Sequence, residues 1–120
     1  MLEGTMEKAR ELGRLLGQTE EYQALARARK RVGEDRELVQ LLNRLGELEG
    51  QMARSLERGE APAAEVQEDY ERSFATLQAS PVYQSLVAAQ ANFERVLARV
   101  NGEIAKGIEA GAQSRIILPS

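Results

Sequence analysis

The sequence predicts an all-α fold, an elongated antiparallel helical bundle or hairpin of about five helices, two of them long, that forms oligomers. Apolar residues recur at spacings of three and four along most of the chain, and no segment alternates as a strand does. Residues that start and stop helices separate these periodic segments. The 120 residues allow one domain. We expect a helical domain over residues 1–111 and a C-terminal tail over 112–120.

The first two helices are expected over residues 3–16 and 20–32. One face of the first carries Met6, Ala9, Leu12, Leu15 and Leu16. Thr19 is the expected N-cap of the second, because its hydroxyl can accept a hydrogen bond from a free backbone N–H of the first turn. Gly33 follows the last periodic residue and is the expected C-terminal cap.

The third helix is expected over residues 36–58, with Asp35 as its N-cap. Its apolar residues follow a heptad pattern. Leu38, Leu45 and Met52 lie seven apart, and Leu41 and Leu48 lie seven apart on the neighbouring row. The segment from Gly59 to Pro62 is the clearest break, with Gly after one helix and Pro opening the next.

The fourth and fifth helices are expected over residues 63–78 and from Val82 to about Ile108. Ser80 and Pro81 mark the start of the fifth, since Ser is a good N-cap and Pro fits the first helical position. The apolar stripe of this helix is Val82, Leu86, Ala89, Phe93, Val96, Val100 and Ile104. Gly107 and Gly111 weaken the helix, and the apolar cluster at 116–118 should pack on something.

The two long helices predict self-association. At 1.5 Å per residue they span roughly 35 and 40 Å, whereas a compact domain of this size has a radius of gyration of roughly 14 Å. Their seams are therefore expected to extend past one core and to be covered in a homodimer or higher homo-oligomer. The predicted interface residues are Leu38, Leu41, Leu45, Leu48, Met52, Leu86, Phe93 and Val100.

The composition excludes much of enzyme chemistry. The chain has no His, Cys or Trp, so it cannot form a Ser-His-Asp or Cys-His nucleophile or a Cys-held iron–sulfur cluster by itself. Glu65, Glu68 and Glu71 repeat at spacings of three, but a di-iron site of the ferritin type requires Glu-x-x-His. A solvated face is the favoured interpretation of these carboxylates. We therefore expect no catalytic activity, metal or cofactor.

A basic cluster ends the second helix, at Arg27, Arg29, Lys30 and Arg31. These cations can stabilise the C-terminus of a helix, which is the favoured interpretation. The alternative is contact with phosphate or another anionic partner, and a nucleic-acid-binding regulator is the second functional hypothesis. The acidic overall balance, a net charge of −3, and the low aromatic content make nucleic acid the less favoured partner.

No apolar run reaches the roughly 20 residues of a membrane span. Charged residues at positions 3, 7, 8, 10 and 11 interrupt any secretory signal. A cytoplasmic protein is the expectation. Gln90, Asn92 and Asn101 on the fifth helix leave two alternatives open, surface amides or polar residues that fix the register of a helix interface.

Several stretches, taken in order, resemble the YlbF/YmcA family of small helical bacterial regulators, which includes the YheA-type proteins. They are the segment 9–13, the segment Thr19-Glu20-Glu21-Tyr22 with Leu25, the segment 35–42 matching D-x-E-L-x-x-L-L, Ser80-Pro81-Val82, the segment 89–93, and Val100-Asn101. The resemblance covers about residues 6–108 and lies in the order and spacing of the set.

This resemblance implies a self-associating cytosolic regulator without catalytic activity. Family members act on competence, sporulation and biofilm formation, in a complex of related proteins that influences ribonuclease Y and messenger-RNA processing. The resemblance therefore implies related regulators and the ribonuclease Y machinery as partners. Some members carry cysteines associated with an iron–sulfur cluster. This chain has no cysteine, so that property does not carry over.

Overall fold

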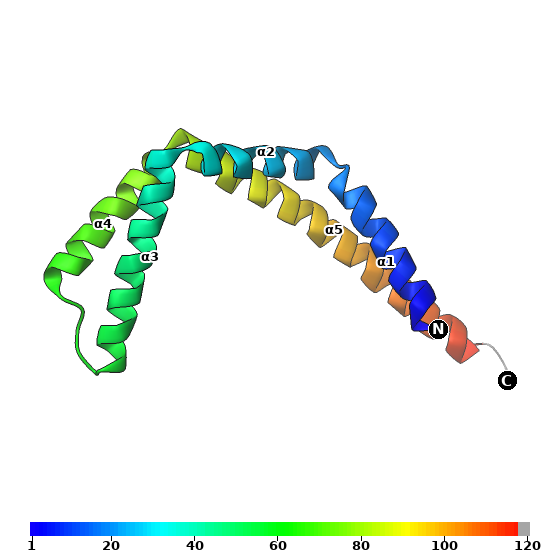
Figure 1. Ribbon diagram of the computed structural model, residues 1–120. Coiled ribbons are helices and arrows are strands. Elements are labelled where there is room, and N and C mark those ends of the chain that lie inside the picture. The colour runs from blue at the N-terminus through cyan, green and yellow to red at the C-terminus, as the bar shows by residue number, and fades with distance from the viewer. Residues whose placement is uncertain (118–120) are drawn as a thin grey trace.

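Five helices make up the computed structural model, which describes residues 1–117 and the side chains through Ser114. They are α1 (Leu2–Gly17), α2 (Glu20–Glu34), α3 (Arg36–Glu57), α4 (Ala64–Ala79) and α5 (Pro81–Ile117). Figure 1 shows an arch in which α3 and α4 form a hairpin at one end and α1 and α5 extend toward the other. The described residues contain no strand. The predicted all-α, elongated fold is thus confirmed.

Side-chain caps fix three of the helix starts, as the sequence predicts. The Tyr22 backbone N–H donates to the Thr19 hydroxyl at 3.1 Å, and the Leu38 N–H donates to the Asp35 carboxylate at 3.1 Å. Ser80 caps α5 in the same way, accepting from the Tyr83 N–H at 3.2 Å. Each cap satisfies a backbone donor that the first turn of a helix leaves without an intrahelical partner.

Two predicted helix boundaries are wrong. Gly33 lies inside α2, which ends at Glu34, because Asp35 both leaves the helical conformation and caps α3. Pro62 does not open a helix, since Ala63 is the N-cap and α4 begins at Ala64. The break itself is confirmed by Gly59, whose φ of 72° lies in the left-handed region that glycine adopts without a steric penalty.

The last helix is longer than predicted. It continues through Gly107 and Gly111 to Ile117, beyond residue 111, where we placed the start of the tail. Each glycine weakens a helix by about 1 kcal/mol relative to alanine, which the residues around it can offset. The side chains of the apolar cluster at 116–118 lie outside the described part of the structure. The packing of this cluster and the division into domain and tail therefore stay predictions.

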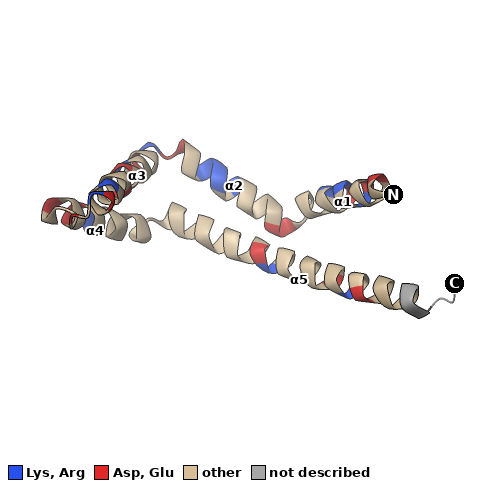
Figure 2. Ribbon diagram, turned by 90° about the horizontal axis from the view of Figure 1, so that it is seen from below, with Lys and Arg blue, Asp and Glu red and all other residues tan. Residues whose placement is uncertain are grey.

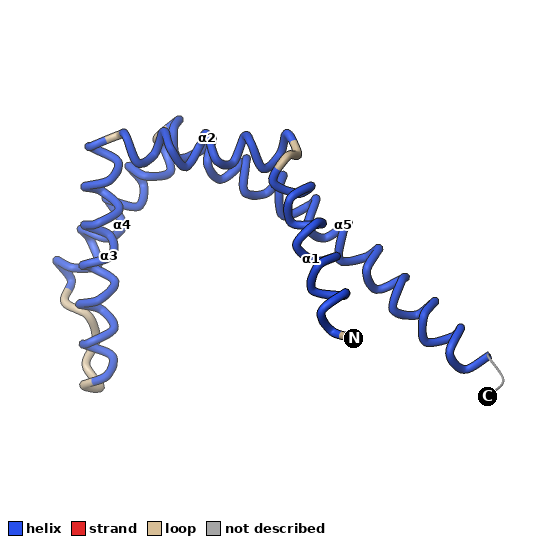
Figure 3. The backbone as a smooth tube through the Cα atoms, turned by 45° about the vertical axis from the view of Figure 1, so that its right-hand side comes forward, coloured by secondary structure: helices blue, strands red, loops and turns tan. Residues whose placement is uncertain are grey.

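Two helix pairs provide the packing, α2 with α5 and α3 with α4, and both pairs are antiparallel (Figure 3). One core cluster lies between α2 and α5, where Leu25, Ala28 and Ala89 are buried. The other joins the hairpin to the bend of the arch. Its buried members are Leu38, Leu45 and Leu77, with Val32, Tyr70, Val82 and Tyr83 among the residues packed around them. Leu45, one of the predicted interface residues, is thus buried within the single chain.

The chain is far from spherical. Its radius of gyration is 21.9 Å and its principal extents are 69 × 38 × 22 Å. A compact chain of 120 residues would have a radius of gyration of about 14 Å. The elongation predicted from the long helices is therefore confirmed, while the oligomeric state stays a prediction.

Candidate interaction surface

The first helix is amphipathic but has no buried residue. Its apolar residues recur on one face, and Leu2 is 72% exposed, Met6 48% and Leu15 63%. Helix α1 also lacks the close packing that joins α2 to α5 and α3 to α4. An amphipathic helix gains most of its stability from packing its apolar face, so α1 lacks its main source of stability in the single chain.

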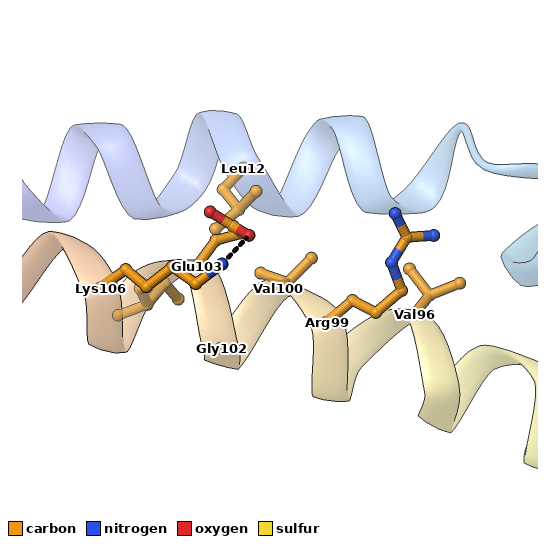
Figure 4. Close-up of a pocket in the computed structure, with 8 residues that line it drawn as sticks. Leu12, Val96, Arg99, Val100, Gly102, Glu103 and Lys106 are labelled. Carbon is orange, nitrogen blue, oxygen red and sulfur yellow. Dashed lines mark hydrogen bonds and ion pairs between the residues drawn. The ribbon is translucent and has the colours of Figure 1, made fainter.

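The C-terminal half of α5 presents a matching stripe. Val100 is half-buried, whereas Ile104 and Ile108, one and two turns further on, are 45% and 67% exposed. Between this stripe and α1 lies an open groove of about 670 Å³. The groove is lined by Leu12, Val96, Arg99, Val100, Gly102, Glu103, Ile104 and Lys106. Figure 4 shows Leu12 on α1 and Val100 on α5 at facing sides of it.

The groove has an aliphatic floor and a charged rim. The rim carries Arg99, Glu103 and Lys106, with the Lys106 ammonium 3.1 Å from the Glu103 carboxylate. Both charges are about three-quarters exposed, so this ion pair contributes little to stability. An aliphatic stripe with a rim of mixed charge suits a second amphipathic helix. We call the exposed apolar residues of α1 and of α5 from Val96 to Ile108 the α1/α5 surface.

The eight predicted interface residues lie in different environments. Leu38, Leu45 and Leu48 are buried within the chain, and Leu48 is only 1% exposed. The others are half-buried, with Leu86 and Phe93 packed on the α2–α5 core and Leu41 on the hairpin core. Among the eight, Val100 lines the α1/α5 groove. The predicted set therefore mixes residues covered inside one copy with one on the open surface.

Sequence reasoning did not include Leu2, Met6, Leu12, Ile104 and Ile108 in its interface set, although it recognised the stripes to which most of them belong. The spacing of apolar residues gave no signal for the open surface, because covered and exposed stripes repeat in the same way. Tertiary pairing decides which stripe is covered. Helix α3 packs on its neighbour α4 and α2 packs on the distant α5, whereas α1 has no such close partner.

The basic cluster is divided between two faces of α2. Arg27 and Arg31 line a shallow groove of about 390 Å³ between α2 and α5, together with Ala24, Ala28, Ser85, Ala88, Ala89 and Asn92. Lys30 lies outside this groove, with its ammonium 4.0 Å from the Glu34 carboxylate. Figure 2 shows the cluster as the blue stretch of α2. The predicted cationic contact is thus reduced to Arg27 and Arg31 on one groove, while Arg29 does not line it.

Carboxylates occur on α4 but form no metal centre. Glu65, Glu68 and Glu71 are all exposed, and no group of three potential metal ligands gathers among the residues that the structure describes. The three amides left open by the sequence are also exposed, and the Asn92 side-chain oxygen accepts a hydrogen bond from Arg95 at 2.7 Å.

Two polar contacts tie α3 to α4. Arg44 forms an ion pair with Asp69, and this hydrogen bond holds the pKa of the Asp69 carboxyl below its ordinary value, against the opposing effect of burial. Tyr70 donates to the Glu49 carboxylate at 3.3 Å. Burial, aided by the negative charge of Glu49, raises the pKa of the Tyr70 hydroxyl. These groups connect helices, and they lie on the hairpin rather than on the α1/α5 surface.

Within the described part of the chain, no helix combines the length and apolar character needed to cross a membrane.

Comparison with solved structures supports the fold. The chain of Bacillus subtilis RicA, crystallised in complex with RicF, is similar with a TM-score of 0.77 and 16% identity, over 90% of this chain and 96% of that one. A protein of unknown function (DUF964) from Bacillus stearothermophilus is similar with a TM-score of 0.61 and 21% identity, over 87% and 91% of the two chains. A search of curated proteins finds no match.

A family model described as control of competence regulator ComK, YlbF/YmcA, matches residues 5–109. This range contains α2, α3 and α4 in full, most of α1, and α5 past its exposed Ile108. It also contains the segments on which the resemblance was based. The chain therefore belongs to the YlbF/YmcA family of competence regulators.

Proposed function

We propose that this protein is a non-catalytic adaptor that associates with itself and with helical segments of other proteins through the α1/α5 surface. The observation that carries the proposal is that apolar residues of α1 and of the end of α5 are exposed beside an open groove, to which α5 contributes Val96, Val100 and Ile104 and α1 contributes Leu12. Large exposed apolar patches of this kind mark interaction sites in soluble proteins. Association would cover both stripes and complete the packing that α1 lacks.

The surface area supports self-association. The chain exposes 9536 Å², whereas a compact monomer of its mass would expose about 6,500 Å². The excess of about 3,000 Å² exceeds the roughly 800 Å² that each partner buries in a standard protein interface. A second copy seated on the α1/α5 surface accounts for part of this excess, since two antiparallel helix pairs can combine into a four-helix bundle.

Family membership supports the regulatory part of the proposal. RicA, which shares the fold, is crystallised in complex with RicF, and an adaptor role for this chain agrees with that arrangement. We propose that the chain contributes to the control of competence, sporulation, biofilm formation or RNA processing by binding related regulators and the ribonuclease Y machinery. The side chains of the α1/α5 surface are those we assign to such contacts.

The test is the mass of the protein in solution and its binding to partners, for the wild type and for Ile104→Asp. A carboxylate at position 104 would be desolvated in the interface, so we expect the variant to be monomeric at micromolar concentration by light scattering. It should also lose partners that the wild type captures in a quantitative pull-down. Circular dichroism should be unchanged, because Ile104 is partly exposed in the single chain.

Ala105→Asp is the matched control. Residue 105 is exposed and adjoins Ile104, but it points about 100° away around the helix. We expect this variant to associate like the wild type. A wild-type protein that is monomeric at micromolar concentration and captures no partner would contradict the proposal.

A further inference from the structure

We propose a second, electrostatic contact between copies of this chain, in which the α2/α5 groove receives the acidic face of α4 from another copy. The groove residues are Ala24, Arg27, Ala28, Arg31, Ser85, Ala88, Ala89 and Asn92. The acidic face is formed by Glu65, Glu68 and Glu71. The inference extends the proposed self-association, but it uses residues outside the α1/α5 surface.

The shape of the groove favours a helix as its occupant. Four alanines and a serine line it, and Ala28 and Ala89 are buried at its base. Small side chains allow a third helix to approach the α2–α5 pair closely, because interhelical distance depends on the side chains at the contact. The groove is open along one side of the pair, so a helix can lie along it.

The charge of the groove selects the kind of helix. Arg27 and Arg31 border it, and no carboxylate lines it. Neither guanidinium forms an ion pair with any carboxylate of the described chain, in contrast to Arg44 and Arg58. The two arginines are one helical turn apart, about 6 Å along the axis. A row of carboxylates with a similar repeat would match them.

Such a row exists on the same chain. Glu65, Glu68 and Glu71 follow one another at about 4.5 Å along α4, and all three are exposed and without an ion pair in the described residues. The spacing places Ala64, Ala75 and Arg72 on the same face, so three carboxylates outnumber one guanidinium there. The net charge of the α4 face is thus opposite to that of the α2/α5 groove.

A second copy must supply one side of the contact. Helix α4 packs on α3 in the hairpin, whereas the groove belongs to the α2–α5 pair on the adjoining part of the arch (Figure 2). If each copy places its α4 in the groove of the other, the contact occurs twice and the assembly closes with two-fold symmetry. RNA is the less favoured occupant because no aromatic side chain lines the groove for stacking.

The experiment is a charge-reversal exchange, measured by sedimentation at about 50 mM and about 500 mM salt, where screening differs strongly. It compares Arg27→Glu/Arg31→Glu with Glu65→Lys/Glu68→Lys/Glu71→Lys, alone and mixed. We expect each variant alone to associate about tenfold more weakly than the wild type at low salt. The mixture should recover association, because the reversed α4 again faces a groove of opposite charge. High salt should weaken the wild-type contact.

Arg29→Glu/Lys30→Glu is the control, since it makes the same charge change on the same helix outside the groove. We expect its association to stay within about twofold of the wild type. Equal weakening by this control, or no recovery in the mixture, would overturn the proposal. Circular dichroism of every variant checks that the helices remain folded.

Two further arms separate the alternatives. Repeating the exchange in the Ile104→Asp background, at protein concentrations well above the micromolar range where that variant is expected to be monomeric, tests the electrostatic contact alone. The electrostatic contact and the α1/α5 contact can then fail independently. A titration with a single-stranded oligouridine tests RNA as the occupant. RNA binding that Arg27→Glu/Arg31→Glu abolishes, with self-association unchanged, would assign the groove to RNA and overturn the inference.

Discussion

The α3/α4 hairpin and the α1/α5 arm are built from similar amphipathic helices, yet the hairpin buries more of its apolar seam within the chain. In the hairpin, Leu38, Leu45 and Leu77 are buried together, and polar contacts from Arg44 and Tyr70 join the two helices. In the arm, α1 has no buried residue and the stripe of α5 becomes more exposed toward Ile108. The difference lies in the partner, since the seams are alike.

The two apolar seams differ in where their packing partner lies. A helix pair joined by a short loop finds its partner locally, so its apolar seam contributes to the folding of the chain. The apolar residues of α1 and of the end of α5 have no such close partner and are exposed in the single chain. In the proposed assembly, covering this apolar surface would stabilise the arm relative to the single chain.

The largest effect is expected from truncating the hairpin core. Leu45→Ala removes a buried side chain and should lower the free energy of unfolding by about 2–5 kcal/mol, from lost burial and the remaining cavity. Leu15→Ala removes the same atoms from an exposed site in the arm and should change it by less than about 0.5 kcal/mol. Urea unfolding in the monomeric Ile104→Asp background measures both. Equal losses at the two sites would contradict the contrast.

Local signals were enough to predict the helices and most of their boundaries. Thr19, Asp35 and Ser80 cap the helices that follow them because the capping interaction involves only neighbouring residues. The errors at Gly33 and after Gly111 have a different origin. At both places a glycine predicted the end of a helix. One glycine lowers helix stability by only about 1 kcal/mol relative to alanine, and the other residues of the helix offset that loss.

The surface was harder to predict because apolar periodicity identifies a face without identifying its partner. Leu45 and Ile104 belong to stripes with the same spacing, yet one is buried and the other is 45% exposed. The predicted interface therefore included Leu38, Leu45 and Leu48, which the chain itself covers. The tertiary pairing of α3 with α4 decides this, and the apolar spacing within one helix carries no information about that pairing.

A smaller effect of opposite sign in the two regions is expected from glycine replacement. Gly107→Ala should stabilise the arm by up to about 1 kcal/mol, because the new Cβ meets no atom within 4 Å and alanine favours the helix. Gly59→Ala should destabilise the hairpin by about 1–2 kcal/mol, because its φ of 72° strains any residue with a Cβ. Hydrogen exchange resolves the two regions. Faster exchange in α5 of Gly107→Ala would contradict the expected stabilisation of the arm.

The smallest effect concerns the polar tie of the hairpin and its dependence on pH. The folded protein holds the pKa of Asp69 below the ordinary value of 3.8, mainly through the hydrogen bond from Arg44. The folded state therefore binds fewer protons at this carboxyl than the unfolded state, and its contribution to stability is present above the unfolded pKa. This contribution is lost as the pH falls through the lowered pKa of Asp69 in the folded protein.

Asp69→Asn should thus be less stable than the wild type at neutral pH, with a difference that shrinks as the pH falls. Glu103→Gln in the arm removes an exposed carboxylate and should leave stability nearly unchanged at neutral pH. Urea unfolding of the three proteins across the acid range measures this, and a difference between wild type and Asp69→Asn that grows as the pH falls would show that Asp69 does not stabilise the hairpin as an anion.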